Sequence, residues 1–341
     1  MNPKKRTTIY DIAKKLGITP SSVSRALNDK AVNEKTKKRI LQAAKELNYK
    51  KNSLASNLRK GESTTIGVVV PRINQNFFSN VISGIENVSY KKGHNLIICQ
   101  SDESYEKEKK CINMLINQHV NCIIMSLSVD TTDYKHLQSI MDQNITLIQF
   151  DRVAEEVESL KVINDNEQAS FEAVSHMIKQ GYKRIALLEG PQTLEIFRQR
   201  KAGYLRALEK HDIAVIDELI RPNAWTKELG ATATRELLSM PSPPDAIFAS
   251  TSDFSALGVH EVAMEMGFKV PSQLGICGYS NEPFTEITSP SITTIDQFSF
   301  QMGTTIAELY FQEINKSDTA KISKVISIKP KLIVRASTLK E

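Results

Sequence analysis

The amino-acid sequence predicts an N-terminal all-α head of the helix-turn-helix type, a short hinge, and a two-lobed α/β body with parallel sheets. Three observations lead to this fold class. Two helix-period apolar patterns, joined by a glycine, lie close to the N-terminus. The region that contains them is strongly basic. From Ile66 onward, short apolar runs alternate with helical patterns.

The stretch from Thr8 to Asn28 supplies the two helices of the predicted helix-turn-helix. Apolar residues at i, i+3, i+4 and i+7 make one stripe on the first helix: Ile9, Ile12, Ala13 and Leu16. Thr8 and Asp11 form a start signal, because each side chain can satisfy an unpaired N–H group of the helix end. Gly17 permits a sharp turn, and Thr19 and Pro20 suit the start of the second helix. The apolar face of that helix leaves these polar residues pointing outward: Ser21, Ser22, Arg25 and Asn28.

A third helix is predicted over residues 35–47, with Asn33 as its cap. Periodicity alone is equally consistent with an ordinary helical hairpin that has a solvated polar face. Charge separates the two interpretations: residues 1–60 carry 16 Lys and Arg against 4 Asp and Glu, whereas the rest of the chain has a net charge of −7. A basic head on a mildly acidic body favours a module that binds DNA.

The segment NSLASNLRKGES, residues 52–63, links the head to the body. Ser53 can cap a helix of about two turns, which Gly61 ends. A helix this short is marginal in water, because helix nucleation is costly. Two interpretations stay open: a flexible linker in the DNA-free protein, and a segment that folds when DNA binds.

In the body, strand and helix patterns alternate often enough for two open parallel sheets. The predicted strands are 66–71, 95–100, 122–127, 146–150, 185–189, 245–250 and 274–279. The predicted helices are 77–92, 104–118, 166–180, 196–210, 228–239 and 254–266. Such sheets bind ligands beyond the carboxyl ends of their strands. No GxGxxG or Walker-type loop follows a strand, so we expect no nucleotide cofactor.

The segments YDIAKKLGITPSSVSRALN and KTKKRILQAAKELNYKKNSLASNLRKG resemble the head and hinge of the lactose-repressor (LacI/GalR) family of bacterial transcription regulators. The resemblance covers nearly the whole chain. It implies a homodimeric repressor that binds a pseudopalindromic DNA operator under the control of a small-molecule effector, such as a sugar, sugar acid, sugar phosphate or nucleobase. It also implies two periplasmic-binding-protein-like lobes that close around the effector.

With this family organisation, we expect four parts in the chain. Residues 1–51 form the head and 52–61 the hinge. Residues 62–163 plus 293–323 form the N-lobe, and residues 164–292 plus 324–341 form the C-lobe. The chain would cross between the lobes near 162–165, 291–297 and 323–325.

Arg25 is the residue best suited to a bidentate contact with guanine. Ser21 and Ser22 would lie against base edges, and the resemblance implies an apolar contact from Pro20. It also implies that Leu58 of a paired hinge helix wedges into the minor groove. The candidate DNA-contacting residues are Thr8, Tyr10, Thr19, Pro20, Ser21, Ser22, Arg25, Asn28, Asn33, Tyr49, Asn52, Ala55 and Leu58.

Candidate effector residues follow predicted strands or match family positions. They are Asn76, Phe77, Asp151, Arg198, Trp225, Ser252, Asp253, Ser280 and Gln297. For each, the alternative is a helix cap or a surface polar residue. Ser280, in GYSNEPF, departs from the family, which typically has aspartate there. The effector would then be anionic, with Arg198 and Arg200 as suitable partners, or would make fewer contacts on this side.

Other classes of protein are not supported. The four cysteines lack CxxC spacing, which predicts small buried thiols rather than a metal site or disulfides. The scattered histidines give no zinc spacing and no catalytic triad, so we expect neither a metal nor an enzyme. The N-terminus is no secretory signal, which predicts a cytoplasmic protein. Two alternatives remain: a small-molecule binding protein that acts away from DNA, and a DNA-binding regulator controlled by a protein co-regulator.

Overall fold

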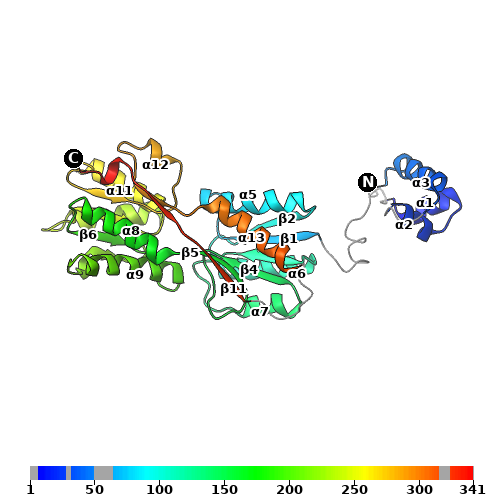
Figure 1. Ribbon diagram of the computed structural model, residues 1–341, viewed down its shortest axis with the longest axis horizontal. Coiled ribbons are helices and arrows are strands. Elements are labelled where there is room, and N and C mark those ends of the chain that lie inside the picture. Colours follow the sequence, from blue (N-terminus) through cyan, green and yellow to red (C-terminus); the bar gives the residue numbers. More distant parts are fainter. Residues whose placement is uncertain (1–6, 28–31, 50–63, 315–322, 341) are drawn as a thin grey trace. The chain divides into compact units, whose positions relative to one another are not determined.

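The computed structural model describes residues 7–27, 32–49, 64–314 and 323–340, and it divides the chain into two compact units, 1–63 and 64–341 (Figure 1). The first unit is the head and the second is the body. The predicted hinge residues Asn52, Ala55 and Leu58 lie outside the described residues, as does Asn28.

The head contains the three predicted helices: α1 (Ile9–Leu16), α2 (Pro20–Leu27) and α3 (Glu34–Glu46). The Asp11 carboxylate accepts a hydrogen bond of 2.7 Å from the Thr8 main-chain N–H, which fixes the start of α1. Gly17 ends α1 with φ 65°, a conformation that suits glycine. The apolar stripes of the three helices meet in one core: Ile12, Ala13, Val23, Ala26, Ile40, Ala43 and Ala44. The predicted helix-turn-helix architecture is confirmed.

The first lobe of the body is built on a six-stranded parallel sheet of order β11-β5-β4-β3-β1-β2. Its strands are β1 (Thr65–Val70), β2 (Asn95–Gln100), β3 (Cys122–Met125), β4 (Thr146–Phe150), β5 (Leu160–Asn164) and β11 (Lys324–Ile328). Helices α5 (Asn76–Lys91) and α13 (Ser299–Glu313) pack on one face. Helices α6 (Tyr105–Asn117) and α7 (Lys135–Asp142) pack on the other.

Helices α5 and α13, far apart in the sequence, lie side by side (Figure 1). Glycines permit this close contact. A Cβ added to Gly303 would lie 2.1 Å from the Val81 carbonyl oxygen, and one added to Gly84 would lie 2.3 Å from that of Phe300. After the second lobe, the chain returns to the first lobe and forms α13. Together α5 and α13 cover the apolar face of the first sheet.

The second lobe is built on a four-stranded parallel sheet of order β7-β6-β8-β9. The strands are β6 (Ile185–Leu188), β7 (Ile220–Arg221), β8 (Ala246–Ala249) and β9 (Gly275–Cys277). Helices α8 (Asn166–Lys179) and α9 (Glu195–Lys210) cover one face, and α10 (Lys227–Leu238) and α11 (Asp253–Glu265) cover the other. The short helix α12 (Phe284–Ile287) follows β9. The predicted α/β body with parallel sheets is confirmed.

Two of the expected lobe boundaries are wrong. Residues 324–328 form β11, which pairs with β5 at the edge of the first sheet, so they belong to the N-lobe and not the C-lobe. Residues 294–296 form β10, which pairs with β12 (Lys331–Ile333), and Thr293 bridges Cys277 of β9. They therefore belong to the C-lobe. The edge strand β11 is largely exposed, which is why its apolar pattern was too weak to place it.

Candidate functional site

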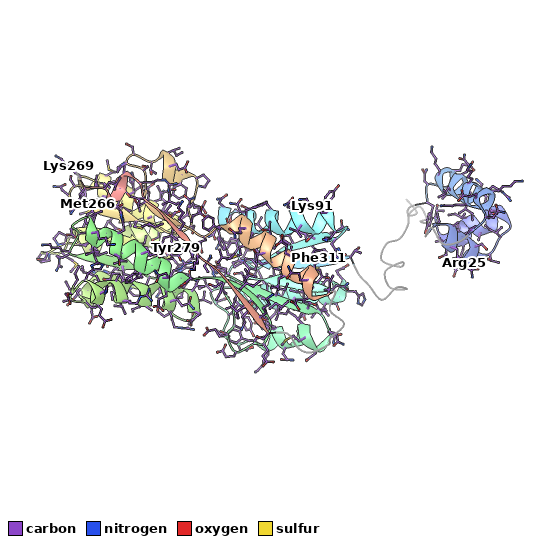
Figure 2. The ribbon with its side chains drawn as sticks, in the orientation of Figure 1. Arg25, Lys91, Met266, Lys269, Tyr279 and Phe311 are labelled. Atoms are coloured by element: carbon purple, nitrogen blue, oxygen red, sulfur yellow. The ribbon has the colours of Figure 1, made fainter. Side chains whose placement is uncertain are left out.

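In the head, α2 presents the side chains that could read DNA. Ser21 is exposed, Ser22 is partly buried, and Val23 and Ala26 pack into the core. Arg25 is also exposed (Figure 2). The Thr19 hydroxyl caps the helix by accepting from the Ser22 N–H at 3.3 Å. Arg25 is exposed on this face, and a guanidinium group can make the bidentate contact by which arginine reads a guanine.

The remaining head candidates surround this helix. Thr8 and Tyr10 lie at the exposed start of α1, and the Tyr10 side chain is 68% exposed. The Asn33 side chain caps α3 by accepting from the Lys35 N–H at 2.9 Å. Tyr49 packs against the edge of the head core. Of these, Tyr10 is the most accessible to a macromolecule.

In the body, polar side chains collect where the carboxyl ends of the strands of both lobes meet. On the first lobe, Asp151 follows β4 and is 6% exposed. The adjacent Arg152 donates to Glu103 across 2.7 Å, and its Nε lies 3.9 Å from the Asp151 carboxylate. Burial raises the pKa of Asp151, although Arg152 and Arg200 oppose that rise. Glu103 Oε1 and Arg152 Nε are buried with no hydrogen-bond partner in the described part of the chain.

On the second lobe, the centre of the site is Arg200 of α9, which is 2% exposed. Its guanidinium donates to the carbonyl oxygens of Ser250 and Thr251 at 2.8 and 3.2 Å. It also donates to the side-chain oxygens of Asn166 and Gln297 at 3.0 and 3.3 Å. These four acceptors come from α8, from the segment after β8, and from the link between β10 and α13. Arg200 therefore ties the second lobe to one of the segments that cross between the lobes.

Asp253 begins α11 and is completely buried. Its carboxylate accepts hydrogen bonds from the Thr294 hydroxyl at 2.6 Å and the Glu282 N–H at 2.7 Å. Gly278 permits this arrangement, because a Cβ there would lie 2.1 Å from the Asp253 Oδ1 atom. Burial raises the pKa of Asp253 to about 6, and the hydrogen bonds limit the rise.

Glu282 joins the two lobes directly. It lies in the loop after β9, and its carboxylate accepts hydrogen bonds from the main-chain N–H groups of Asn76 and Phe77, the first residues of α5. A helix N-terminus favours a carboxylate there. Burial, with the neighbouring Asp253 charge, nevertheless raises the pKa of Glu282 to about 7. The contact holds the second lobe against the first.

A small cavity lies between residues of the two lobes. Its volume is ≈ 20 Å³, room for about one water molecule. It is lined by Asp151, Val153, Glu155, Ile163, Asn166, Glu195, Ile196 and Gln199. This cavity is polar on both sides, with Asp151 and Glu155 on the first lobe and Asn166, Glu195 and Gln199 on the second.

The structure brings many of the predicted effector residues together. Asn76 and Phe77 meet Glu282, and the Gln297 side chain links Arg200 to Ser280, whose Oγ accepts from Gln297 Nε2 at 3.3 Å. Arg198 does not join this group. Its side chain is exposed, forms an ion pair with Glu195, and donates hydrogen bonds to the carbonyl oxygens of Gln192 and Thr193. Ser252 is an N-cap of α11, and Trp225 is partly buried in the loop before α10.

The sequence indicated Arg200 only as a possible partner of an anionic effector. It did not indicate that Asn166, Tyr279 and Glu282 belong to the site. The GYSN segment already carried a signal for Tyr279, since the aromatic residue directly precedes Ser280. Glu282 lacked any such signal, because its partners Asn76 and Phe77 lie some two hundred residues earlier in the chain.

The described residues contain no group of three or more His, Cys, Asp or Glu side chains that could hold a metal ion. In the ranges that the structure covers, no helix is long and apolar enough to cross a membrane.

Comparisons with known proteins agree with this arrangement. Residues 8–52 match the family described as bacterial regulatory proteins, lacI family, and residues 174–338 match the periplasmic binding protein-like domain. The chain is 33% identical to the HTH-type transcriptional repressor CytR of Escherichia coli (strain K12), over 97% of this chain and 96% of the relative. It is 30% identical to the HTH-type transcriptional repressor PurR of Vibrio campbellii, over 98% and 99% of the two chains.

The fold has a counterpart among solved structures. The lac repressor dimer, solved bound to its operator and the anti-inducer ONPF, superimposes with a TM-score of 0.85. The match covers 98% of this chain and all of the other, at 24% sequence identity, and so it shows a shared fold.

Proposed function

The chain belongs to the lacI family of bacterial regulatory proteins and is a DNA-binding transcriptional regulator, and from that premise we propose that a small molecule bound between its lobes controls operator binding. The observation that carries the proposal is the set of buried polar side chains between the lobes, centred on Asp151, Arg200 and Asp253. Buried polar atoms that have no hydrogen-bond partner among the described residues, such as Glu103 Oε1 and Arg152 Nε, are the kind that a ligand or a bound water satisfies.

On DNA, we propose that α2 of each head enters the major groove of one half-site. Arg25 would contact guanine, with Ser21 and Ser22 against neighbouring base edges and Pro20 making an apolar contact. Thr8, Tyr10, Thr19, Asn33 and Tyr49 would position the head on the backbone, since such contacts fix register without reading sequence. A two-fold symmetric dimer requires a pseudopalindromic operator. The hinge residues Ala55 and Leu58 would act in the minor groove.

Effector control would operate through the closure of the lobes. A ligand between them can change the closed geometry only if it binds one arrangement more tightly than the other. Glu282 contacts the first residues of α5, and Gln297 lies in the segment that crosses between the lobes, so we expect a change in lobe arrangement to pass through these two residues. The coupling is reciprocal: an inducer weakens operator binding by the factor by which operator weakens inducer binding.

For the effector, we propose a sugar, a sugar derivative or a nucleobase, held by Asp151, Arg200, Asp253, Ser280 and Gln297, with Phe77 and Trp225 as aromatic walls. Arg200 is preferred to Arg198 as the contacting arginine, because Arg198 is exposed and already paired with Glu195. Ser280 leaves two versions of the site open: one for an anionic effector and one for a neutral effector with fewer contacts. The relatives are repressors, and we propose no catalytic activity for this chain. It would act in the cytoplasm, where operator DNA is accessible.

The test is a thermal-shift screen of the full-length protein against sugars, sugar acids, sugar phosphates and nucleobases. Each hit is then titrated into a complex of the protein with promoter DNA from upstream of its own gene. A hit that stabilises the protein and releases the DNA supports an inducible repressor, and one that tightens DNA binding supports corepression. Intact DNA binding with no hit in any class would contradict a small-molecule effector of these kinds.

A further inference from the structure

Cys99 and Cys111 hold their thiols against each other in the first lobe. Cys99 lies in the edge strand β2, Cys111 lies in helix α6, which packs on that strand, and the two side chains are hydrogen-bonded. The Cys111 Sγ also lies 3.8 Å from the Gln100 carbonyl oxygen, next to Cys99 in the strand. Both side chains belong to one apolar cluster between β2 and α6, with Cys99 in its buried core and Cys111 packed against it. The two thiols therefore share the same space between strand and helix, which is the arrangement that a disulfide requires.

The two thiols differ in access and in acidity. Cys99 is 7% exposed, whereas Cys111 is partly exposed, unlike the fully buried thiol that the sequence predicted. The hydrogen bond from Cys99 lowers the pKa of Cys111 below its usual value, and Lys107 assists, whereas burial, Glu108 and Asp102 oppose the change. The same hydrogen bond and burial raise the pKa of Cys99. Cys111 is therefore the thiolate that reacts first at neutral pH.

We propose that Cys99 and Cys111 form a redox-responsive pair, which hydrogen peroxide converts into an intramolecular disulfide and a dithiol reductant restores. The Cys111 thiolate attacks one peroxide oxygen, the O–O bond breaks, and the departing oxygen leaves as water after taking a proton. The resulting Cys111 sulfenic acid is attacked by the Cys99 sulfur, which forms the S–S bond and releases a second water. Two thiols are oxidised and one peroxide is reduced.

This site also lies close to the cleft between the lobes. Directly after Cys99, the Gln100 side chain accepts from the Ile73 N–H at 2.9 Å, and Glu103 pairs with Arg152 beside Asp151. A disulfide to α6 would restrain the strand end that carries these groups. Oxidation of Cys99 and Cys111 requires no effector in the cleft, because only the two thiols and the peroxide react.

The experiment treats the full-length protein with hydrogen peroxide at neutral pH, alkylates the remaining thiols and maps them by mass spectrometry. We expect the wild type to lose two alkylatable thiols, to yield a peptide pair cross-linked between Cys99 and Cys111, and to regain both thiols in dithiothreitol. In Cys99→Ser, Cys111 should instead be trapped by dimedone as the sulfenic acid. In Cys111→Ser, Cys99 should stay reduced because it is buried.

Cys122→Ser is the matched control, because Cys122 is completely buried and burial raises its pKa; its oxidation should match the wild type. Circular dichroism confirms that each variant is folded. A folded wild type that forms no Cys99–Cys111 disulfide would overturn the proposal. So would a disulfide formed only between molecules, or a Cys111 that alkylates no faster than Cys122 and Cys277.

Discussion

The Arg200 guanidinium lies flat against the ring of Tyr279, with 3.6 Å between its central carbon and the ring centre. Both side chains are buried, and both donate to the side-chain oxygen of Asn166, at 3.0 Å in each case. Tyr279 lies where the second lobe faces the first (Figure 2). The stacked pair fixes the floor of the cleft on the second lobe, because a planar cation on an aromatic face has little freedom to move.

The first prediction concerns the two arginines of α9. Arg200→Met should destabilise the protein by about 3 kcal/mol, because the acceptors of its hydrogen bonds become buried and unpaired. Arg198→Met should cost within about 1 kcal/mol, because its ion pair with Glu195 is on the surface. Urea denaturation of both variants measures the difference. Equal losses would show that Arg200 is not the buried anchor of the site.

The second prediction concerns pH. In the folded protein the pKa of Asp253 is raised from 3.8 to about 6 and that of Glu282 from 4.5 to about 7. The folded state therefore binds protons more tightly than the unfolded state, and the resulting stability is full below about pH 4 and lost as the pH rises through 6 to 7. Since one pKa unit is about 1.4 kcal/mol, Asp253 alone contributes roughly 3 kcal/mol to this change.

The measurement is the urea midpoint between pH 4 and pH 8, for the wild type and for the Asp253→Asn/Glu282→Gln double variant. The wild type should lose stability more steeply with rising pH, because the double variant has no carboxyl at either position. Parallel curves would mean that neither carboxyl titrates in this range.

The third prediction concerns the contact between Gly278 and Asp253. Gly278→Ala should destabilise the protein by about 1–3 kcal/mol, because the new Cβ would press on the Asp253 carboxylate. In an Asp253→Ala background the same substitution should cost clearly less, since the clashing oxygen is gone. A double-mutant cycle measures this coupling energy, and strictly additive effects would place the strain elsewhere.

The fourth prediction concerns recognition of DNA. Arg25→Ala should weaken operator binding by about 1–3 kcal/mol and relax the preference for one base, because a bidentate contact is lost. Folding should be unchanged, since Arg25 is exposed. Lys45→Ala, which removes one exposed charge from α3, should leave that base preference intact. Fluorescence anisotropy on operator variants, at one fixed salt concentration, distinguishes these results.

The fifth prediction concerns the charge of the effector. Ser280 accepts from the Gln297 amide and adds no charge to a site that already contains Asp253. If the effector is anionic, Ser280→Asp should weaken its binding tenfold or more, by about 1.4 kcal/mol. Calorimetry with the hit from the screen measures this. Tighter binding of a neutral sugar by the variant would refute the anionic version.

Most of the architecture could be predicted, because periodicity is a local property of the chain. The helices of the head match their apolar patterns to within a few residues, as do the strands and helices that were predicted between residues 66 and 279. Strands β5 and β7 and helix α7 also lie in this range and were not predicted. The third crossing between lobes was misplaced because β11 is recognised by its pairing with β5, and that partner is distant in sequence. Asp151 and Asp253 could be proposed because each directly follows a strand, where a parallel sheet places its ligand-facing residues.

The choice between Arg198 and Arg200 shows what the sequence by itself determined and what only the tertiary structure decided. The segment FRQRKAG determined that an arginine-bearing helix follows β6. Two positions along a helix are turned by roughly 200°, so only one of these arginines can face the cleft, and the packing of α9 on α8 selects Arg200. The contact of Glu282 with the start of α5 likewise exists only once both lobes are folded. Local patterns specify elements, whereas a site shared by two lobes depends on contacts between residues far apart in the chain.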